Sequence, residues 1–88
     1  MNLSLLDTGG AVLLISQFTL QGDCRKGRRP GFDGAEEPAR ARQLYEYTAE
    51  LVRRQRVTAA TGVFGAHMLV RSTNVGPVTF LLDSRRQF

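Results

Sequence analysis

The chain has 88 residues, which is enough for one small domain spanning residues 1–88. A hydrophobic fraction of 42% indicates a globular protein, and no apolar run approaches the roughly 20 residues that a membrane-spanning helix needs. The net charge of +4 fits a polyanionic partner, although a solvated basic surface explains it equally well. The first residues lack the basic segment and cleavage site of a signal peptide, so we expect a cytoplasmic protein with no membrane partner.

The N-terminal part of the chain is expected to be extended. Residues 1–10 indicate a short strand or arm that ends in a glycine turn, and residues 11–19 form the first well-defined strand. Both faces of that strand are apolar up to Ser16, so it should be covered on both sides. Side chains alternate along a strand, which puts Gln17 and Thr19 on one face at the rim of the core, where functional sites are often built.

A loop and one helix follow. Glycines, a proline and a run of charges break any periodicity over residues 21–37, and Phe32 is expected to anchor this loop to the body of the domain. Residues 38–55 carry apolar side chains at three- and four-residue spacing, which predicts an amphipathic helix. Pro38 suits its first position, the two glutamates before it suit the positive end of the helix dipole, and the arginines near its last turn suit the negative end.

The rest of the chain predicts two further strands, over residues 63–71 and 78–82, joined by a turn and followed by a polar tail that should fray. The strands at 11–19 and 78–82 are apolar on both faces, yet one helix can cover only one face. A partner chain or more polypeptide is therefore needed to complete the structure. The predicted fold class is α/β, a mixed sheet with one main amphipathic helix.

The chemical inventory excludes several kinds of site. Cys24 is the only cysteine and His67 the only histidine, which excludes an intrachain disulfide, a cysteine metal cluster and a multi-histidine metal site. A Ser-His-Asp or Cys-His arrangement would have to use His67. A strand histidine and a bystander thiol are the simpler interpretations of these two residues. We therefore expect no metal and no cofactor.

Arginine dominates the positive charge, supplying 11 of the 12 basic residues. Its planar fork can bind two phosphate oxygens, which favours a nucleic-acid partner over a single small anion. The densest cluster lies in the loop after the first strand, and the candidates for phosphate contacts are Arg25, Lys26, Arg28 and Arg29. If they bind phosphates, affinity should fall steeply as salt is raised.

Two motifs resemble the signatures of the D-aminoacyl-tRNA deacylase (D-Tyr-tRNA deacylase) family, and segments between them match in order and spacing. The motifs are Ser16-Gln17-Phe18-Thr19-Leu20 and Asn74-Val75-Gly76-Pro77-Val78-Thr79. The resemblance covers nearly the whole chain. It begins at residue 1, at a point that lies inside the chain of family members, after several dozen residues that supply the first strands. The expected fold is therefore an incomplete, C-terminal part of the deacylase fold, which is β-barrel-like.

The resemblance implies a homodimer that hydrolyses the ester joining a D-amino acid to the 3′-terminal adenosine of tRNA, and that also removes glycine mischarged on tRNA. It implies that the pocket is lined by the strand end Ser16, Gln17, Phe18 and Thr19, which would be the catalytic residues. It implies further that Gly76 and Pro77, joined by a cis peptide bond, enter the pocket of the other subunit and exclude L-amino acids. Without the resemblance, an ordinary trans turn would be the expectation at this Gly-Pro pair.

The mechanism that these residues favour is assisted by the substrate. No sequence signal places a histidine base beside Thr19, so Thr19 is expected to be a poor nucleophile, and the tRNA 2′-hydroxyl would help to activate water. Backbone N–H groups at the strand end could stabilise the oxyanion. Ala66 and Met68 share a face of the strand predicted over 63–71, where core packing and pocket lining are both open.

Two functions of other kinds stay open beside the deacylase. One is a non-catalytic basic fragment that binds tRNA or RNA, and the other is an inactive truncated remnant or interaction protein. Chirality-dependent release of D-amino acids from charged tRNA separates the enzyme from both. Salt-sensitive RNA binding separates the second function from the third.

Overall fold

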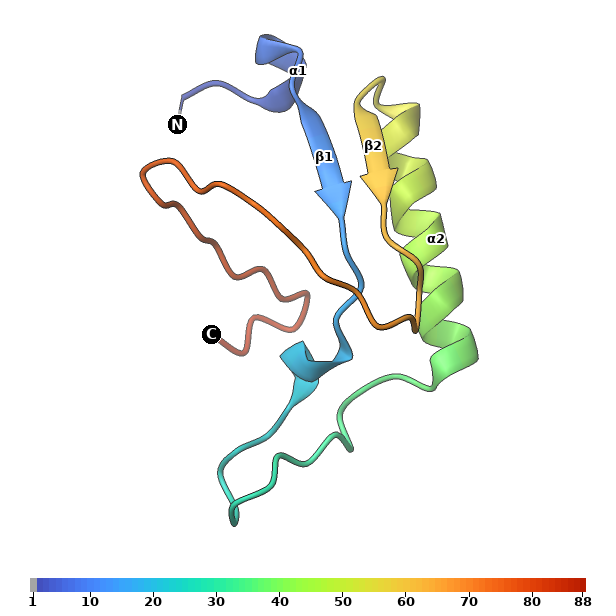
Figure 1. The fold of residues 1–88 in the computed structure, drawn as a ribbon, viewed down its shortest axis with the longest axis vertical. Helices are drawn as coiled ribbons and strands as arrows, with labels where there is room; N and C mark the ends of the chain where they lie inside the picture. The colour runs from blue at the N-terminus through green and yellow to red at the C-terminus, as the bar shows by residue number, and fades with distance from the viewer. Residues whose placement is uncertain (1) are drawn as a thin grey trace.

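The computed structural model describes residues 2–88 and contains five regular elements (Figure 1). In chain order they are α1 (Leu5–Thr8), β1 (Ala11–Leu14), the 3₁₀ helix η1 (Phe18–Gln21), α2 (Pro38–Arg54) and β2 (Thr58–Thr61). β1 and β2 lie side by side with α2 along β2, while the loop after η1 and the C-terminal part of the chain extend away from them (Figure 1). The frame that positions the candidate site is therefore a β-α-β unit.

The first residues form a helical turn instead of the expected extended arm. The Ser4 side chain accepts a hydrogen bond from the backbone N–H of Asp7, and the Asp7 carboxylate accepts one from the backbone N–H of Ser4, which makes a capping box. Gly9 then ends the turn in the left-handed conformation, with φ at 71°. The prediction of an arm was wrong because the capping box of Ser4 and Asp7, which lie three residues apart, outweighs the weak alternation of Leu3 and Leu5.

The long helix is confirmed almost residue for residue, over 38–54 against the predicted 38–55. Pro38 occupies its first turn, and the Glu37 carboxylate accepts hydrogen bonds from the backbone N–H groups of Ala39 and Arg40. Basic residues occupy the last turn. Each of these signals acts between residues that are close in sequence, so the sequence alone predicts this helix correctly.

The sheet is smaller than predicted and has a different second strand. β1 ends at Leu14, five residues early, and pairs in parallel with β2 in the register Ala11↔Thr58 to Leu14↔Thr61. β2 falls in the stretch that was expected to be a connection, whereas residues 63–71 and 78–82 form no strand. A strand needs a hydrogen-bonded neighbour, and within residues 2–88 these apolar stretches find none.

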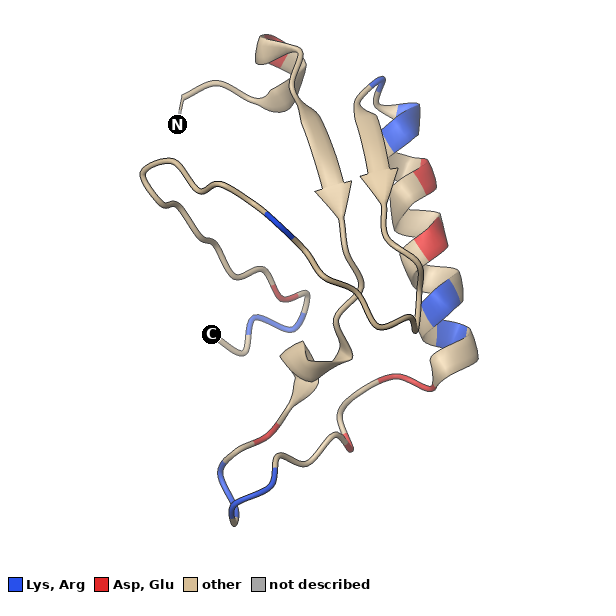
Figure 2. Ribbon diagram, viewed as in Figure 1, with Lys and Arg blue, Asp and Glu red and all other residues tan. Residues whose placement is uncertain are grey.

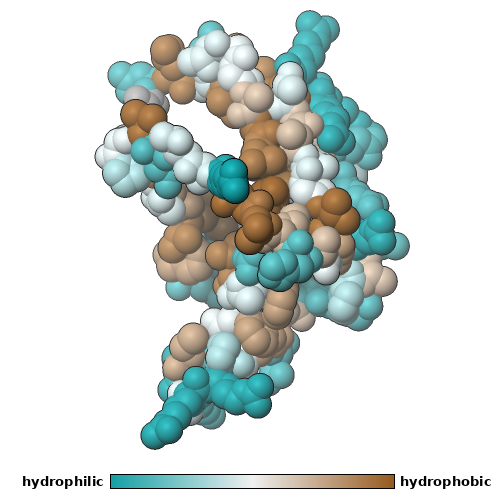
Figure 3. Space-filling view, viewed as in Figure 1, coloured by the Kyte–Doolittle hydropathy of each residue, from teal (hydrophilic) through white to brown (hydrophobic). Residues whose placement is uncertain are grey.

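The core is correspondingly small. Ala49 of α2 is the one buried residue among residues 2–88, with 2% of its surface exposed. Figure 3 shows apolar side chains gathered across the middle of the face that carries β1, open to solvent. The prediction of an α/β fold with one main amphipathic helix is confirmed, but the sheet is two-stranded and parallel, and it is not a closed barrel. The sequence predicted strands that are apolar on both faces and that a single helix cannot cover. The open apolar face follows from this lack of cover.

None of the helices in residues 2–88 combines the length and the apolar character that crossing a membrane requires.

Candidate functional site

The rim after β1 is built by a change from strand to 3₁₀ helix. Ser16 is half-buried, whereas Gln17, Phe18 and Thr19 are exposed, and η1 begins at Phe18. The Gln17 side-chain amide donates a hydrogen bond to Thr19 Oγ1. The sequence predicted that these two side chains share the face of a strand. They do meet, but they do so because the chain turns at Phe18, since β1 has already ended.

The end of β1 is held by α2 through a contact that the sequence did not suggest. Tyr45 Oη donates a 2.6 Å hydrogen bond to the backbone oxygen of Leu14, which also accepts from the N–H of Gly62 at 3.3 Å. The Tyr45 ring packs against Phe64, with 5.9 Å between ring centroids. The sequence places Tyr45 only on the apolar face of the predicted helix, because a phenol and an apolar ring follow the same periodicity. Its hydroxyl fixes the backbone two residues before Ser16.

Met68 and Ala66 are separated by the structure. Met68 is half-buried and lines a shallow hollow beside β1, together with Leu13, Ile15, Gly62 and Val63. Ala66 is exposed and lies outside that hollow. The expected common strand face for the two residues is absent because residues 63–71 form no strand. Core packing describes Met68 here, and the pocket-lining role of both residues stays a prediction.

Gly76 and Pro77 lie far from the rim in this single chain. They belong to the exposed excursion between the third quarter of the chain and its C-terminus, whose tip is well separated from η1 in Figure 1. No peptide bond among residues 2–88 is cis, so the expected cis bond between Gly76 and Pro77 is not found. The trans form is the lower in free energy by about 0.5–1 kcal/mol, and both residues are exposed.

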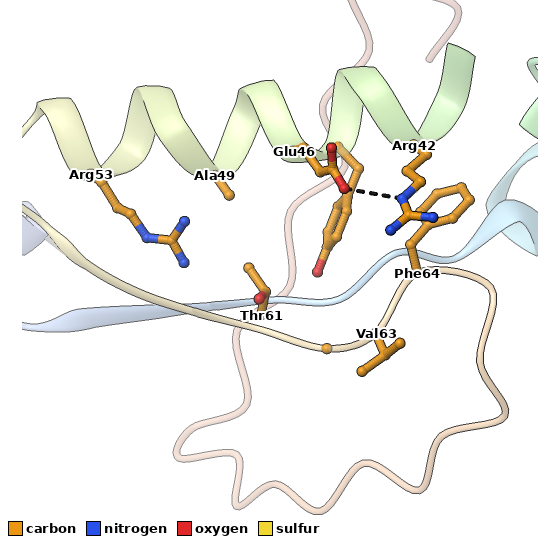
Figure 4. A pocket seen from close by; sticks show the side chains of 9 residues that line it. Arg42, Glu46, Ala49, Arg53, Thr61, Val63 and Phe64 are labelled. Atoms are coloured by element: carbon orange, nitrogen blue, oxygen red, sulfur yellow. Dashed lines mark hydrogen bonds and ion pairs between the residues drawn. The ribbon is translucent and has the colours of Figure 1, made fainter. Parts of the chain in front are cut away.

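A second hollow lies between α2 and the end of β2, lined by side chains that Figure 4 draws. Arg42 Nε and Glu46 Oε1 are 3.0 Å apart across one helical turn, and Arg53 Nη2 donates to the backbone oxygen of Ala59 at 3.1 Å. Both guanidinium groups are therefore engaged within the chain. Arg53 therefore ties the helix to the strand, in addition to its predicted role at the helix end.

The loop after η1 is tied at its neck. Asp23 and Gly31 form an antiparallel bridge, and the Phe18 and Phe32 rings meet edge to face with 5.0 Å between centroids. The predicted anchoring of the loop by Phe32 is confirmed by this contact. Figure 2 shows the basic residues of the loop in blue toward its far tip, and Cys24 beside them in sequence is exposed. His67, in contrast, is exposed in the irregular segment after β2 and lies outside every hydrogen bond of the rim.

Among residues 2–88, the Asp23 carboxyl has the pKa that is shifted most from its ordinary value. Hydrogen bonds from Arg25 lower its pKa to about 2, and the carboxylate in turn raises the pKa of the Arg25 guanidinium. Arg25 Nη2 and Asp23 Oδ2 are 2.8 Å apart. Of the four predicted phosphate ligands, the structure therefore brings Arg25 onto a carboxylate of its own loop, and leaves Lys26, Arg28 and Arg29 exposed.

Comparison with known proteins gives a consistent result over the whole chain. A family model described as D-Tyr-tRNA(Tyr) deacylase matches residues 1–83. The D-aminoacyl-tRNA deacylase of Clostridioides difficile is 58% identical over all 88 residues, and that of Koribacter versatilis is 57% identical over the same length. The deacylase of Anoxybacillus flavithermus is 56% identical over 97% of the chain. The chain spans 59% of the length of the first two relatives and 58% of the third.

Proposed function

Because the chain belongs to the D-Tyr-tRNA(Tyr) deacylase family, we propose that it hydrolyses the ester bond of D-aminoacyl-tRNA, and of glycine mischarged on tRNA, releasing the amino acid and tRNA. The match over residues 1–83, which includes both signature motifs, is the observation that carries this proposal. We propose that the chain forms part of a single deacylase domain, acts in the cytoplasm and works as a homodimer. These are proposals because the chain spans 59% of its relatives.

The rim favours positioning of substrate and water over attack by a side chain. An aminoacyl ester is already activated, so a modest lowering of the barrier suffices. Thr19 Oγ1 accepts its hydrogen bond from an amide donor, and an amide cannot take the hydroxyl proton as a general base would. Backbone N–H groups where β1 gives way to η1 would stabilise the oxyanion, and the 2′-hydroxyl of the substrate would help to activate water.

The experiment for the activity uses tRNA charged with a D-amino acid and with its L enantiomer. Release of the amino acid is followed by loss of acid-precipitable label. The proposal expects release from the D substrate and from glycyl-tRNA, with the L substrate left intact. Equal rates for the two enantiomers, or no release above the spontaneous rate for any of the three, would count against it.

Thr19→Ala tests the mechanism separately. We expect the rate constant to fall by about tenfold or less, because one positioning hydrogen bond contributes about 1 kcal/mol. Loss of all turnover with tRNA binding retained, or capture of an acyl group on Thr19, would establish a nucleophilic mechanism instead. Thr19→Ser keeps the hydroxyl and serves as the matched control.

Gly76 and Pro77 would act on the pocket of a second chain. Two features support this proposal: the pair lies within the matched residues, and it is exposed in this single chain. A proline restricts its own φ, so a backbone carbonyl next to it makes a stiff wall against the side chain of an L-amino acid.

A second function, RNA binding without catalysis, is favoured by one specific observation. The cationic loop tip is fully formed on a neck of its own, whereas the rim rests on a frame in which Ala49 is the one buried residue of residues 2–88. A chain that binds RNA in a salt-sensitive way but leaves D-aminoacyl-tRNA intact would have this function.

A further inference from the structure

The loop after η1 is closed by a small β-bridge. Asp23 N donates to the backbone oxygen of Gly31 at 2.7 Å, and Gly31 N donates to the backbone oxygen of Asp23 at 2.8 Å. Gly27 at the tip has φ at 70°, a conformation that glycine adopts without strain and that lets the chain reverse. The space where a Cβ would stand at this residue is open. The neck therefore presents residues 24–30 as one exposed tip.

Arg25 is occupied by the neck itself. The two oxygens of the Asp23 carboxylate accept from the backbone N–H of Arg25 at 2.9 Å, from its Nε at 2.9 Å and from its Nη2 at 2.8 Å. This two-pronged pairing uses the geometry that would otherwise bind a phosphate. The pair is also electrically neutral as a unit, so it adds little to the attraction of a polyanion.

The other three cations of the tip are free. The ion pairs within residues 2–88 join Arg25 to Asp23 and, on α2, Arg42 to Glu46 and Arg54 to Glu50. Lys26, Arg28 and Arg29 take part in none of them and are exposed. In Figure 2 they form the blue tip of the loop, and the acidic residues of this region lie further up its two limbs.

The loop tip and the rim are connected through η1, and this connection indicates a role for the three free cations. The loop leaves η1 directly, and the contact between Phe18 and Phe32 fixes its base to the same element that carries Thr19. A strand whose 3′ end lies at the rim would therefore run along the loop with its phosphates toward the tip.

We propose that Lys26, Arg28 and Arg29 bind consecutive phosphates of the RNA strand whose 3′ end enters the rim, while Arg25 acts with Asp23 as a clasp that shapes the loop. The choice of an RNA strand rests on the proposed function. The ligand is otherwise defined by its chemistry, a flexible phosphodiester chain with a free end. Single strands lose affinity with a slope of about −0.7 per phosphate contact, so three contacts predict about a 20-fold loss between 50 and 200 mM salt.

The test measures binding of RNA that carries no amino acid, so the result does not depend on catalysis. The probe is a short RNA helix with a single-stranded 3′ tail, titrated with the chain by fluorescence anisotropy at several salt concentrations. Replacing Lys26, Arg28 and Arg29 with Gln should reduce the slope of log affinity against log salt by about 2. The control replaces Arg71, Arg85 and Arg86 with Gln, which removes the same charge from elsewhere and should reduce the slope much less.

The clasp is tested by Asp23→Asn combined with Arg25→Gln, which leaves net charge unchanged. We expect the slope to stay that of the unaltered chain, because no phosphate contact is lost, and the affinity to fall by less than in the tip variant, because the loop loses the contacts that shape it. Helix content from circular dichroism confirms that each variant retains α2. Equal loss in the control triple variant, equal binding of a blunt-ended helix, or a clasp variant as weak as the tip variant would overturn the proposal. If RNA binds as expected and no ester is cleaved, the proposed activity fails while this inference stands.

Discussion

At the scale of the residue, Tyr45 links the helix to the candidate site. Its phenol oxygen donates a hydrogen bond to the backbone oxygen of Leu14, the last residue of β1, and Ser16 and Gln17 lie two and three residues further along the chain. A hydrogen bond to a backbone group positions the chain itself, so its loss would be transmitted to the next residues. The half-buried Tyr45 ring keeps its packing on Phe64 whether or not the hydroxyl is present.

Tyr45→Phe isolates that hydrogen bond. We expect the free energy of unfolding to fall by about 1 kcal/mol, at the lower end if the N–H of Gly62 continues to satisfy the Leu14 oxygen. Urea denaturation followed by circular dichroism measures the change. Tyr47→Phe is the control, because the Tyr47 side chain is 51% exposed on the same helix. A loss of equal size in both variants would contradict the role of the Tyr45 hydroxyl.

The Asp23 carboxyl makes a prediction about pH. Its pKa lies at about 2 in the folded chain against an ordinary 3.8, so its pairing with Arg25 stabilises the loop above pH 4. That stabilisation is lost as the pH falls through 2. Carboxyl chemical shifts followed by NMR should titrate with a midpoint near 2 for Asp23, and Arg25→Gln should raise the pKa toward 3.8. A midpoint that does not change on replacing Arg25 would show that the ion pair does not form in solution.

At the scale of the element, the helix could be predicted from the sequence and the sheet could not. Pro38, Glu37 and the basic last turn act within a few residues of one another, so their meaning does not depend on distant partners. A strand depends on what lies beside it. Thr58–Thr61 has little apolar character but lies next to β1 once α2 brings the chain back, whereas residues 63–71 and 78–82 are apolar and have no neighbour.

Ala49 tests the packing of α2 on β2. Its side chain faces the strand beside the hollow of Figure 4 and is 2% exposed, so a larger side chain there would disturb the packing of α2 on β2. We expect Ala49→Leu to lower the free energy of unfolding by about 2 kcal/mol through overpacking. Ala39→Leu makes the same change at an exposed position of α2 and should alter stability by no more than about 0.5 kcal/mol. Thermal unfolding of both variants compares them, and an unchanged Ala49→Leu chain would contradict the packing.

At the scale of the whole molecule, apolar side chains outside the β-α-β unit lack cover. Leu69, Val75 and Leu82 are 88%, 88% and 93% exposed. Figure 3 also shows apolar side chains gathered on the face that carries β1, and an exposed apolar patch of this kind is usually buried against another surface. The sequence anticipated this deficit from strands that are apolar on both faces. It placed the rim at the end of a strand over residues 11–19, whereas β1 ends at Leu14 and the rim is formed by η1 and the residues before it. It could not find the hydrogen bond of Tyr45 to the Leu14 backbone or the pairing of Asp23 with Arg25, since each is a contact of the folded chain and not a periodic pattern.

The last prediction concerns two chains at once. If Gly76 and Pro77 of one chain guard the pocket of another, Pro77→Ala should relax chirality, so that L-aminoacyl-tRNA is also hydrolysed. A second variant, Thr19→Trp, fills its own rim and hydrolyses neither enantiomer. When this blocked chain is added in excess and the two are refolded together, nearly every Pro77→Ala chain has a blocked partner that still carries the natural Gly76-Pro77 pair.

The partner's intact pair would then reject the L substrate at the one open pocket of each mixed dimer. Hydrolysis of L-aminoacyl-tRNA should therefore disappear as the blocked chain is added, while hydrolysis of D-aminoacyl-tRNA continues at that same pocket. If Pro77 acted within its own chain, the open pocket would keep the altered residue and L hydrolysis would persist in the mixture. The two arrangements thus give opposite results with one pair of variants, because a trans-acting wall is the single feature that a blocked partner can restore.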